Sequence, residues 1–162
     1  MLTDEKYYNT GVPRPVEFEE SGINQITYRW ENYAKGVYEK RYREWKDDAG
    51  LYYTTKWTRD AGKFRTPPLR YILYTAPYMH AGQLFTLEEV IDFYNKGGGE
   101  NEFTKRYRNK TKILQPLKLS DAEKGALVAF LEEISGKEIR MAVPKVPPYG
   151  VAPDVPGLTQ AQ

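Results

Sequence analysis

The chain has 162 residues, which is the length of one domain with or without extensions. Its 24 lysines and arginines nearly balance its 22 aspartates and glutamates, whereas a nucleic-acid-binding protein usually carries a clear excess of positive charge. Cysteine is absent and there is a single histidine, which excludes disulfides, thiolate metal sites, a cysteine nucleophile and any metal site made of several histidines.

The first residues carry no apolar core of a signal peptide, and no segment approaches the roughly 18 apolar residues of a membrane span. We therefore expect neither an export signal nor a membrane span in this chain. Asn9–Gly11 and Val12–Pro15 predict turns and extended chain, because each proline fixes its own φ angle and restricts the residue before it.

Residues 20–49 are dense in charged and aromatic side chains. Within them Tyr38, Tyr42 and Trp45 recur with the spacing of one helix face, which predicts a helix near residues 37–48. An aromatic face of this kind has to pack against another part of the protein or against a partner.

A helix over residues 87–95 is predicted by agreement between its start, its periodicity and its end. Thr86 and Glu89 form the pattern of a capping box, and three glycines at 97–99 terminate the segment. The apolar positions between them share one face: Leu87, Val90, Ile91 and Tyr94.

A second helix, over residues 121–135, begins at Ser120 with the capping partner Glu123 and ends at Gly136. Its apolar positions are Leu127, Phe130, Leu131 and Ile134. We expect the apolar faces of the two helices to pack together. Between residues 50 and 86, Pro67-Pro68 forbids a regular helix and Thr75–Gly82 predicts a tight turn.

The segment 137–162 differs from the rest, since it holds five of the eleven prolines. Such a composition cannot form a packed core alone. It predicts either a disordered tail or an extended arm that lies on a partner.

Several stretches together resemble the C-terminal haem domain of the di-haem cytochrome c peroxidase and MauG family. They are Gly62–Arg70 (GKFRTPPLR), Thr75–His80 (TAPYMH) and Thr86–Asn95 (TLEEVIDFYN), supported by Leu2–Pro13 and Pro116–Ser120. The resemblance covers about residues 1–15 and 50–136. It implies a domain over residues 1–136 with an insertion at about 20–49, followed by an extended Pro-rich tail over 137–162.

The resemblance implies a mostly α, cytochrome c-like helical domain with long irregular loops. Members of the family use two c-type haems to handle hydrogen peroxide and are periplasmic. The haem of this domain has a histidine from a C-x-x-C-H motif on one side and a methionine or tyrosine on the other. Aligned on the helix that starts T-L-E-E, that second ligand falls on Tyr94.

The departures from the family pattern are informative. The C-x-x-C-H motif is missing, and without cysteine no haem c can be attached to this chain. The chain begins about where that motif would end, so we expect a partner chain to carry the haem c in a hetero-oligomer. Tyr71 and Ala81 replace an asparagine and an aspartate of the family pattern.

The resemblance nominates five residues for haem binding. Tyr94 is the candidate iron ligand, while its place on an apolar helix face also fits a core tyrosine. His80 fits a ligand or, more simply, a residue that fixes its turn, and Met79 fits a ligand or a packing side chain. Arg65 and Arg70 suit haem propionates, or ordinary pairing with surface carboxylates.

These observations predict a redox and electron-transfer subunit that completes a haem pocket, with no catalytic residue of its own. The alternative is a haem-less structural subunit that binds partners through the insertion and tail. A third hypothesis is non-covalent haem b bound by His80 or Tyr94. The basic run Lys105–Lys112 fits an acidic partner or a solvated loop, and we expect no nucleic acid to bind.

Overall fold

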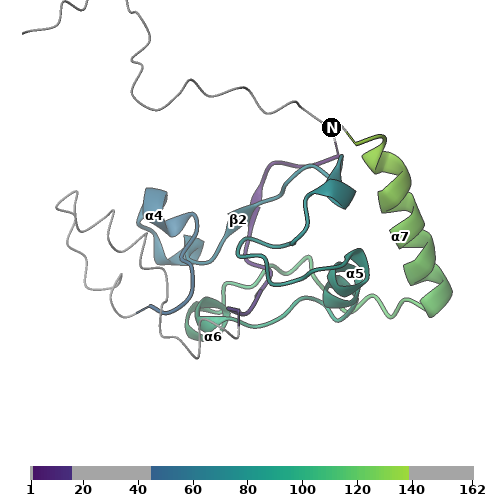
Figure 1. Cartoon of the computed structure of the whole chain (residues 1–162). Helices are drawn as coiled ribbons and strands as arrows, with labels where there is room; N and C mark the ends of the chain where they lie inside the picture. Colours follow the sequence, from purple (N-terminus) through teal and green to yellow (C-terminus); the bar gives the residue numbers. More distant parts are fainter. Residues whose placement is uncertain (1, 16–44, 139–162) are drawn as a thin grey trace, which may run out of the picture.

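The computed structural model of the chain describes residues 2–15 and 45–138 (Figure 1). Most of the insertion, the predicted helix up to residue 44 and the tail after residue 138 lie outside these ranges. Residues 45–48 are not helical, so this end of the prediction is wrong. The reason is a tertiary contact: the N–H groups of Lys46 and Asp47 donate to the Glu102 carboxylate, at 2.9 and 3.5 Å, instead of to a preceding helical turn.

Helices make up most of the regular structure of the described residues. They are α4 (Tyr52–Thr55), α5 (Leu87–Asn95), α6 (Glu102–Tyr107) and α7 (Asp121–Ser135), with two 3-10 turns, η1 (Thr58–Asp60) and η2 (Ile72–Tyr74). Two short strands, β1 (Tyr7–Tyr8) and β2 (Phe64–Arg65), pair antiparallel, with Tyr7 opposite Arg65 and Tyr8 opposite Phe64. Long irregular connections join these elements, as the sequence predicts.

The N-terminal segment crosses the domain and is bonded to several later segments (Figure 1). After β1, the Thr10 carbonyl accepts the Gly99 N–H at 3.1 Å and the Asn9 carbonyl accepts the Thr111 N–H at 2.9 Å. The segment therefore holds together the strand β2, the glycine loop after α5 and the loop after α6.

A first core cluster is aromatic and closed to solvent. It contains Trp45, Ala49, Tyr52, Ala61 and Phe103, and Tyr53 and Tyr107 pack against it. The Trp45 ring meets those of Tyr52 and Phe103 edge to face, with centroids 4.7 and 5.0 Å apart. Trp45, the described member of the predicted aromatic face, thus packs against α4 and α6.

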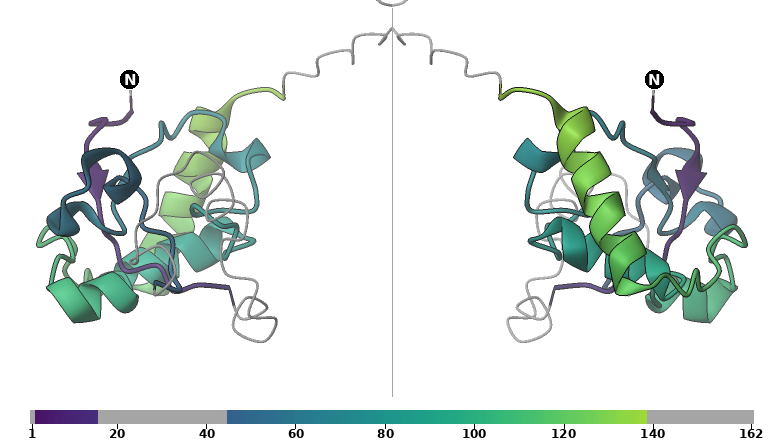
Figure 2. Two further views of the ribbon diagram at one scale, coloured as in Figure 1. Left: turned by 90° about the vertical axis from the view of Figure 1, so that its left-hand side faces the viewer. Right: turned by 90° about the vertical axis from the view of Figure 1, so that its right-hand side faces the viewer.

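A second core cluster lies between α5, α7 and the turn at 78–84. Tyr78, Leu87 and Val90 are its buried members, and the half-buried side chains packed on it are Ile72, Met79, Leu84, Tyr94 and Leu131. Both predicted capping boxes are present, at Thr86–Glu89 and Ser120–Glu123. Helices α5 and α7 lie side by side in both views of Figure 2 and contact one another, as predicted.

The apolar side chains of α7 are less buried than the sequence suggests. Val128, Leu131 and Ile134 are half-buried, whereas Leu127 and Phe130 remain 39% and 50% exposed. The prediction that all four apolar positions pack on α5 is therefore wrong for these two. The helix contacts α5 and η2 on one side only, so its broad apolar surface extends past that contact.

Candidate functional site

Tyr94 lies on α5, near its carboxyl end, where the Thr86 capping box and the apolar periodicity fix the helix in register. The side chain is half-buried against the second core cluster, and its ring meets Phe93 edge to face at 5.4 Å. Its hydroxyl makes no hydrogen bond with any residue that the structure describes. Burial raises the pKa of the phenol above its ordinary value of 10.0. The phenol is half-buried, and its hydroxyl is not among the fully buried polar atoms that lack a partner, so it remains in reach of water.

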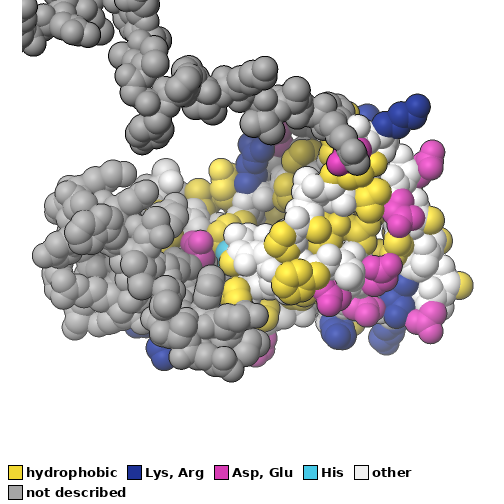
Figure 3. Space-filling model, viewed as in Figure 1, with side chains coloured by type: hydrophobic (Ala, Val, Ile, Leu, Met, Phe, Trp, Pro, Cys, Tyr) yellow, Lys and Arg dark blue, Asp and Glu magenta, His cyan; other side chains and the backbone are white. Residues whose placement is uncertain are grey.

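Large apolar side chains remain exposed on the elements around α5. Four of them belong to η2 and α7: Leu73 (38% exposed), Tyr74 (43%), Leu127 (39%) and Phe130 (50%). Figure 3 shows hydrophobic side chains gathered over this part of the molecule. We call these four residues the open apolar face. Large contiguous patches of exposed apolar side chains are typical of surfaces that bind another molecule.

Met79 lies in the tight turn that the sequence predicts. The turn is closed by two hydrogen bonds between Tyr78 and Leu84, at 2.6 and 3.4 Å, and Met79 itself has a positive φ of 70°. Its side chain is half-buried and packs on the second core cluster, as that of Tyr94 does. The structure thus brings Met79 and Tyr94 to the same cluster, and both interpretations of Met79 stay predictions.

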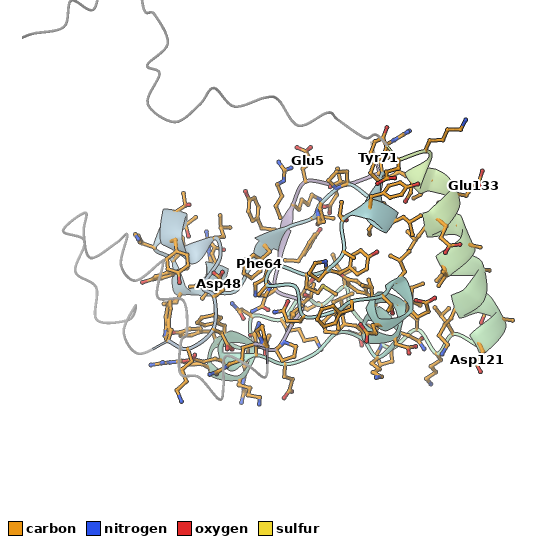
Figure 4. All side chains as sticks on the ribbon, in the orientation of Figure 1. Glu5, Asp48, Phe64, Tyr71, Asp121 and Glu133 are labelled. Atoms are coloured by element: carbon orange, nitrogen blue, oxygen red, sulfur yellow. The ribbon has the colours of Figure 1, made fainter. Side chains whose placement is uncertain are left out.

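His80 has different surroundings, although it follows Met79 directly. Its ring stacks on Phe64 of β2, with centroids 3.8 Å apart and planes 11° apart, and its other face is open to solvent. Burial against Phe64 and the neighbouring chain lowers the pKa of the imidazole below 6.5, while the charges of Asp48 and Asp47 act in the opposite direction. Figure 4 shows Asp48 and Phe64 close together, far from α7. His80 therefore lines a small pocket of mixed polar and apolar side chains, with Arg14, Asp47, Asp48 and Gln83 among its polar members.

Arg65 and Arg70 are both exposed. Neither makes an ion pair with a described carboxylate, and both interpretations of these arginines, haem propionates or ordinary surface pairs, stay predictions. Arg65 sits on β2 opposite Tyr7, and Arg70 comes shortly before η2. Both guanidinium groups are free to bind a carboxylate of another molecule.

Sequence reasoning missed the polar groups that fix this scaffold. Asp47 is buried, pairs with Arg14 at 2.9 Å and accepts the Glu102 N–H at 2.6 Å. Asn101 caps α6 by accepting the N–H groups of Phe103 and Thr104. The cap had a visible signal, an asparagine three residues before a threonine. The Asp47 contacts join residues far apart in the sequence, 55 apart in the case of Glu102, and had no local signal.

Two features are absent from the described ranges. Residues 2–15 and 45–138 contain no group of three or more acidic or histidine side chains placed to hold a metal ion. Among the same residues, no helix combines the length and the apolar character that crossing a bilayer requires.

Comparisons with known proteins agree with this geometry, although no family model matches the chain. Cytochrome-c peroxidase IdrP1 of Pseudomonas sp. (strain SCT) is 49% identical over 138 residues, which are 85% of this chain and 35% of that protein. IdrP2 of Denitromonas iodatirespirans is 40% identical over 147 residues, 91% of this chain and 37% of that protein. The methylamine utilization protein MauG of Methylorubrum extorquens is 37% identical over 84 residues, 52% of this chain and 22% of that protein.

A solved structure is also similar. The crystal structure of a MauG-like protein associated with microbial copper homeostasis superposes with a TM-score of 0.53 at 30% identity, over 80% of this chain and 32% of that one. The chain thus spans about a third of the length of the relatives it matches. Over most of its own length, it is similar in sequence to proteins named cytochrome-c peroxidase, and its fold is similar to that of a MauG-like protein.

Proposed function

We propose that this chain is a redox and electron-transfer component that completes a haem pocket, with the covalent haem c carried by a partner polypeptide. The observation that carries the proposal is Tyr94, a half-buried phenol without a hydrogen-bond partner among the described residues, next to the open apolar face. The similarity to cytochrome-c peroxidases and MauG proteins supports the type of cofactor.

The residues present suit a haem. The open apolar face offers the kind of side chains that cover a porphyrin, and a tyrosine is one of the side chains that hold haem iron. Arg65 and Arg70 are exposed and unpaired within the described ranges, so they are available to the propionate carboxylates. When bound, the haem would supply storage and transfer of electrons, and this chain's part is to shield one face of it and position a phenol.

The state of the Tyr94 proton follows from its surroundings. Burial disfavours the phenolate, so in the chain alone Tyr94 keeps its proton at neutral pH. A cation next to the oxygen favours the opposite state, because an opposite charge within a few ångströms stabilises the ionised form. In the chain alone Tyr94 therefore holds its proton, and if a haem iron were bound there the same residue would be able to hold the iron as the phenolate.

The proposal includes the assembly and its compartment. Since the chain has no cysteine, the thioether-linked haem has to come from elsewhere, and a hetero-oligomer with a haem-bearing subunit satisfies this need. The resemblance to peroxidases with c-type haem supports a periplasmic location.

The test uses a ferric haem c peptide that carries a C-x-x-C-H sequence. We expect the purified chain to shift the Soret band of this peptide on titration. Tyr94→Phe removes only the hydroxyl and should abolish the shift. Tyr107→Phe is the matched control, since it is a half-buried tyrosine on the first core cluster, and it should behave as the unchanged chain. A Tyr94→Phe protein with an unchanged shift would rule out the ligand role.

The chain purified within its native assembly provides the second arm. A Soret band in the assembly but not in the isolated chain is the expected result. An assembly without any Soret band would contradict the proposal and favour a haem-less structural subunit.

A further inference from the structure

A basic surface with an exposed tryptophan lies at η1 and the loop after α6, away from both the second core cluster and the open apolar face. Trp57 is 56% exposed, and the Arg59 guanidinium carbon lies 4.0 Å from the centre of its ring system. This cation–π contact holds the guanidinium against the indole while both groups stay in solvent.

Hydrogen bonds hold the loop after α6 next to η1. The Asn109 side chain donates to the carbonyl oxygens of Arg59 and Ala61, at 3.4 and 2.7 Å. Asn109 in turn accepts a hydrogen bond of 3.0 Å from the buried Asn9 side chain, and the Thr111 N–H donates to the Asn9 carbonyl at 2.9 Å. The loop is therefore fixed at two points. It should lose little conformational entropy when a partner binds, because it is already held in place.

This part of the molecule carries positive charge that forms no ion pair with a described carboxylate, although the charge of Arg59 acts on the neighbouring Asp60 carboxylate. Arg59, Arg108, Lys110 and Lys112 make no ion pair with any residue that the structure describes. With Trp57, we call these four residues the Trp57 surface; Lys110 is its half-buried edge, since its Cε lies beside Gly98 in the loop after α5.

The nearby carboxylates have other partners. Asp60 pairs with Lys63 at 2.9 Å, and Glu100 and Glu102 approach Lys105 and Arg106 at 3.9 Å each. The surplus of positive charge on the Trp57 surface thus remains available to a partner.

We propose that the Trp57 surface binds an acidic patch on a separate protein. Tryptophan and arginine are the residues that most often dominate the energy of protein–protein interfaces, and here they form one preorganised pair. The surrounding cations would add attraction to an acidic patch and speed the encounter.

Two other classes of partner fit the surface less well. A nucleic-acid site needs a larger excess of positive charge than this chain carries. A membrane-binding surface usually presents an amphipathic helix with a whole apolar face, whereas η1 is a three-residue turn with a single exposed ring. The proposal does not depend on haem, because none of the five residues belongs to the second core cluster or the open apolar face.

The experiment measures binding of the full chain to three immobilised probes: poly-L-glutamate, single-stranded oligothymidylate, and vesicles of phosphatidylcholine and phosphatidylserine. We expect binding to poly-L-glutamate that weakens as salt is added, since exposed charges are screened. Arg108→Glu combined with Lys110→Glu should weaken it on the order of tenfold. Trp57→Ser should weaken it too, because Arg59 loses the ring that orients it.

Matched controls separate a local surface from general charge. Lys118→Glu with Lys137→Glu makes the same change of net charge at exposed positions outside the Trp57 surface, and should alter binding less than about twofold. Lys110→Glu with Lys112→Glu gives a second test variant, and circular dichroism checks that each variant is folded. Absence of binding to poly-L-glutamate, an equal loss in the control, or tighter binding to the oligonucleotide or the vesicles would each overturn the proposal.

Discussion

The side chains of Asn9 and Asn101 are hydrogen-bonded in the protein interior although 92 residues separate them in the sequence: the Asn101 Nδ2 donates to the Asn9 Oδ1 at 3.0 Å. Asn9 also accepts the Gly11 N–H and donates to the Ala61 carbonyl and the Asn109 side chain. One buried amide thus links the N-terminal segment, the approach to β2, the cap of α6 and the loop after α6.

Asn9→Ala should destabilise the chain by about 3 kcal/mol, because it removes four hydrogen bonds and leaves buried groups without partners. Urea unfolding followed by circular dichroism measures the change. Gln115→Ala is the control, since its side chain is exposed and makes one hydrogen bond with the described residues, to the Lys112 carbonyl; it should change stability by less than about 0.5 kcal/mol. Equal effects of the two substitutions would show that the Asn9 network contributes nothing.

Two glycines should respond to alanine in opposite directions. Gly11 has a φ of +74°, and an added Cβ would come 2.1 Å from the Gly99 carbonyl oxygen, so Gly11→Ala should destabilise by at least about 3 kcal/mol. Gly125 lies within α7 with nothing within 4 Å of its added Cβ. Gly125→Ala should therefore stabilise by up to about 1 kcal/mol, through helix propensity alone. Thermal unfolding of both variants is the measurement, and a destabilised Gly125→Ala protein would contradict the helix assigned to residues 121–135.

The sequence predicts best those features that depend on interactions between residues a few positions apart. The starts of α5 and α7 follow from Thr86 with Glu89 and Ser120 with Glu123, because a capping box involves groups three residues apart. The tight turn before α5 was visible for the same reason.

The errors all come from contacts between distant segments. Residues 45–48 leave the helical pattern because Glu102 accepts their N–H groups. The periodicity of α7 puts Leu127 and Phe130 on the same apolar face as Leu131. Which part of that face is buried depends on where η2 and α5 pack against the helix. The residues around position 80 do not indicate that His80 stacks on Phe64 while the side chain of its neighbour Met79 packs on the second core cluster.

The stability of the chain should fall as the pH is lowered through about 6.5. The pKa of His80 is lowered in the folded chain by burial, so the unfolded chain binds the proton more readily. The stabilisation is fully present above the unfolded pKa of 6.5 and is lost as the pH falls towards the folded value. His80 is the single histidine, so its ring proton resonance is unambiguous and should titrate with a midpoint below 6.5.

Substitutions separate the causes of this shift. Asp48→Asn removes a charge that raises the pKa of His80, and should move the titration midpoint further down. His80→Gln should flatten the dependence of stability on pH between 5 and 7, because the titrating group is gone. A His80 midpoint above 6.5 in the unchanged chain would mean that the aspartate charges outweigh burial.

Helix α7 should open before the rest of the described domain. Ser135 is its one buried residue, and it fastens the end of the helix by accepting the Leu73 N–H at 3.1 Å and donating to the Leu131 carbonyl at 2.7 Å. At the other end, Lys124 reaches Asp92 of α5 at 3.2 Å, a contact between two half-buried residues that contributes at most about 1 kcal/mol. Amide hydrogens of α7 should therefore exchange faster than those of residues 99–111, which lie on the Asn9 network and the closed aromatic cluster.

Ser135→Ala tests this order of opening, because it removes the two hydrogen bonds of the Ser135 hydroxyl and leaves the apolar side chains of α7 unchanged. Exchange in α7 should rise on the order of tenfold, which corresponds to about 1.4 kcal/mol, while residues 99–111 keep their protection. Ser120→Ala is the comparison, since it frays only the first turn. If a haem-bearing partner covers the open apolar face, amide hydrogen exchange should slow more in α7 than in the rest of the described domain. Equal exchange of α7 and residues 99–111 in the isolated chain would show instead that the two core clusters unfold as one unit, and that α7 needs no partner to stay in place.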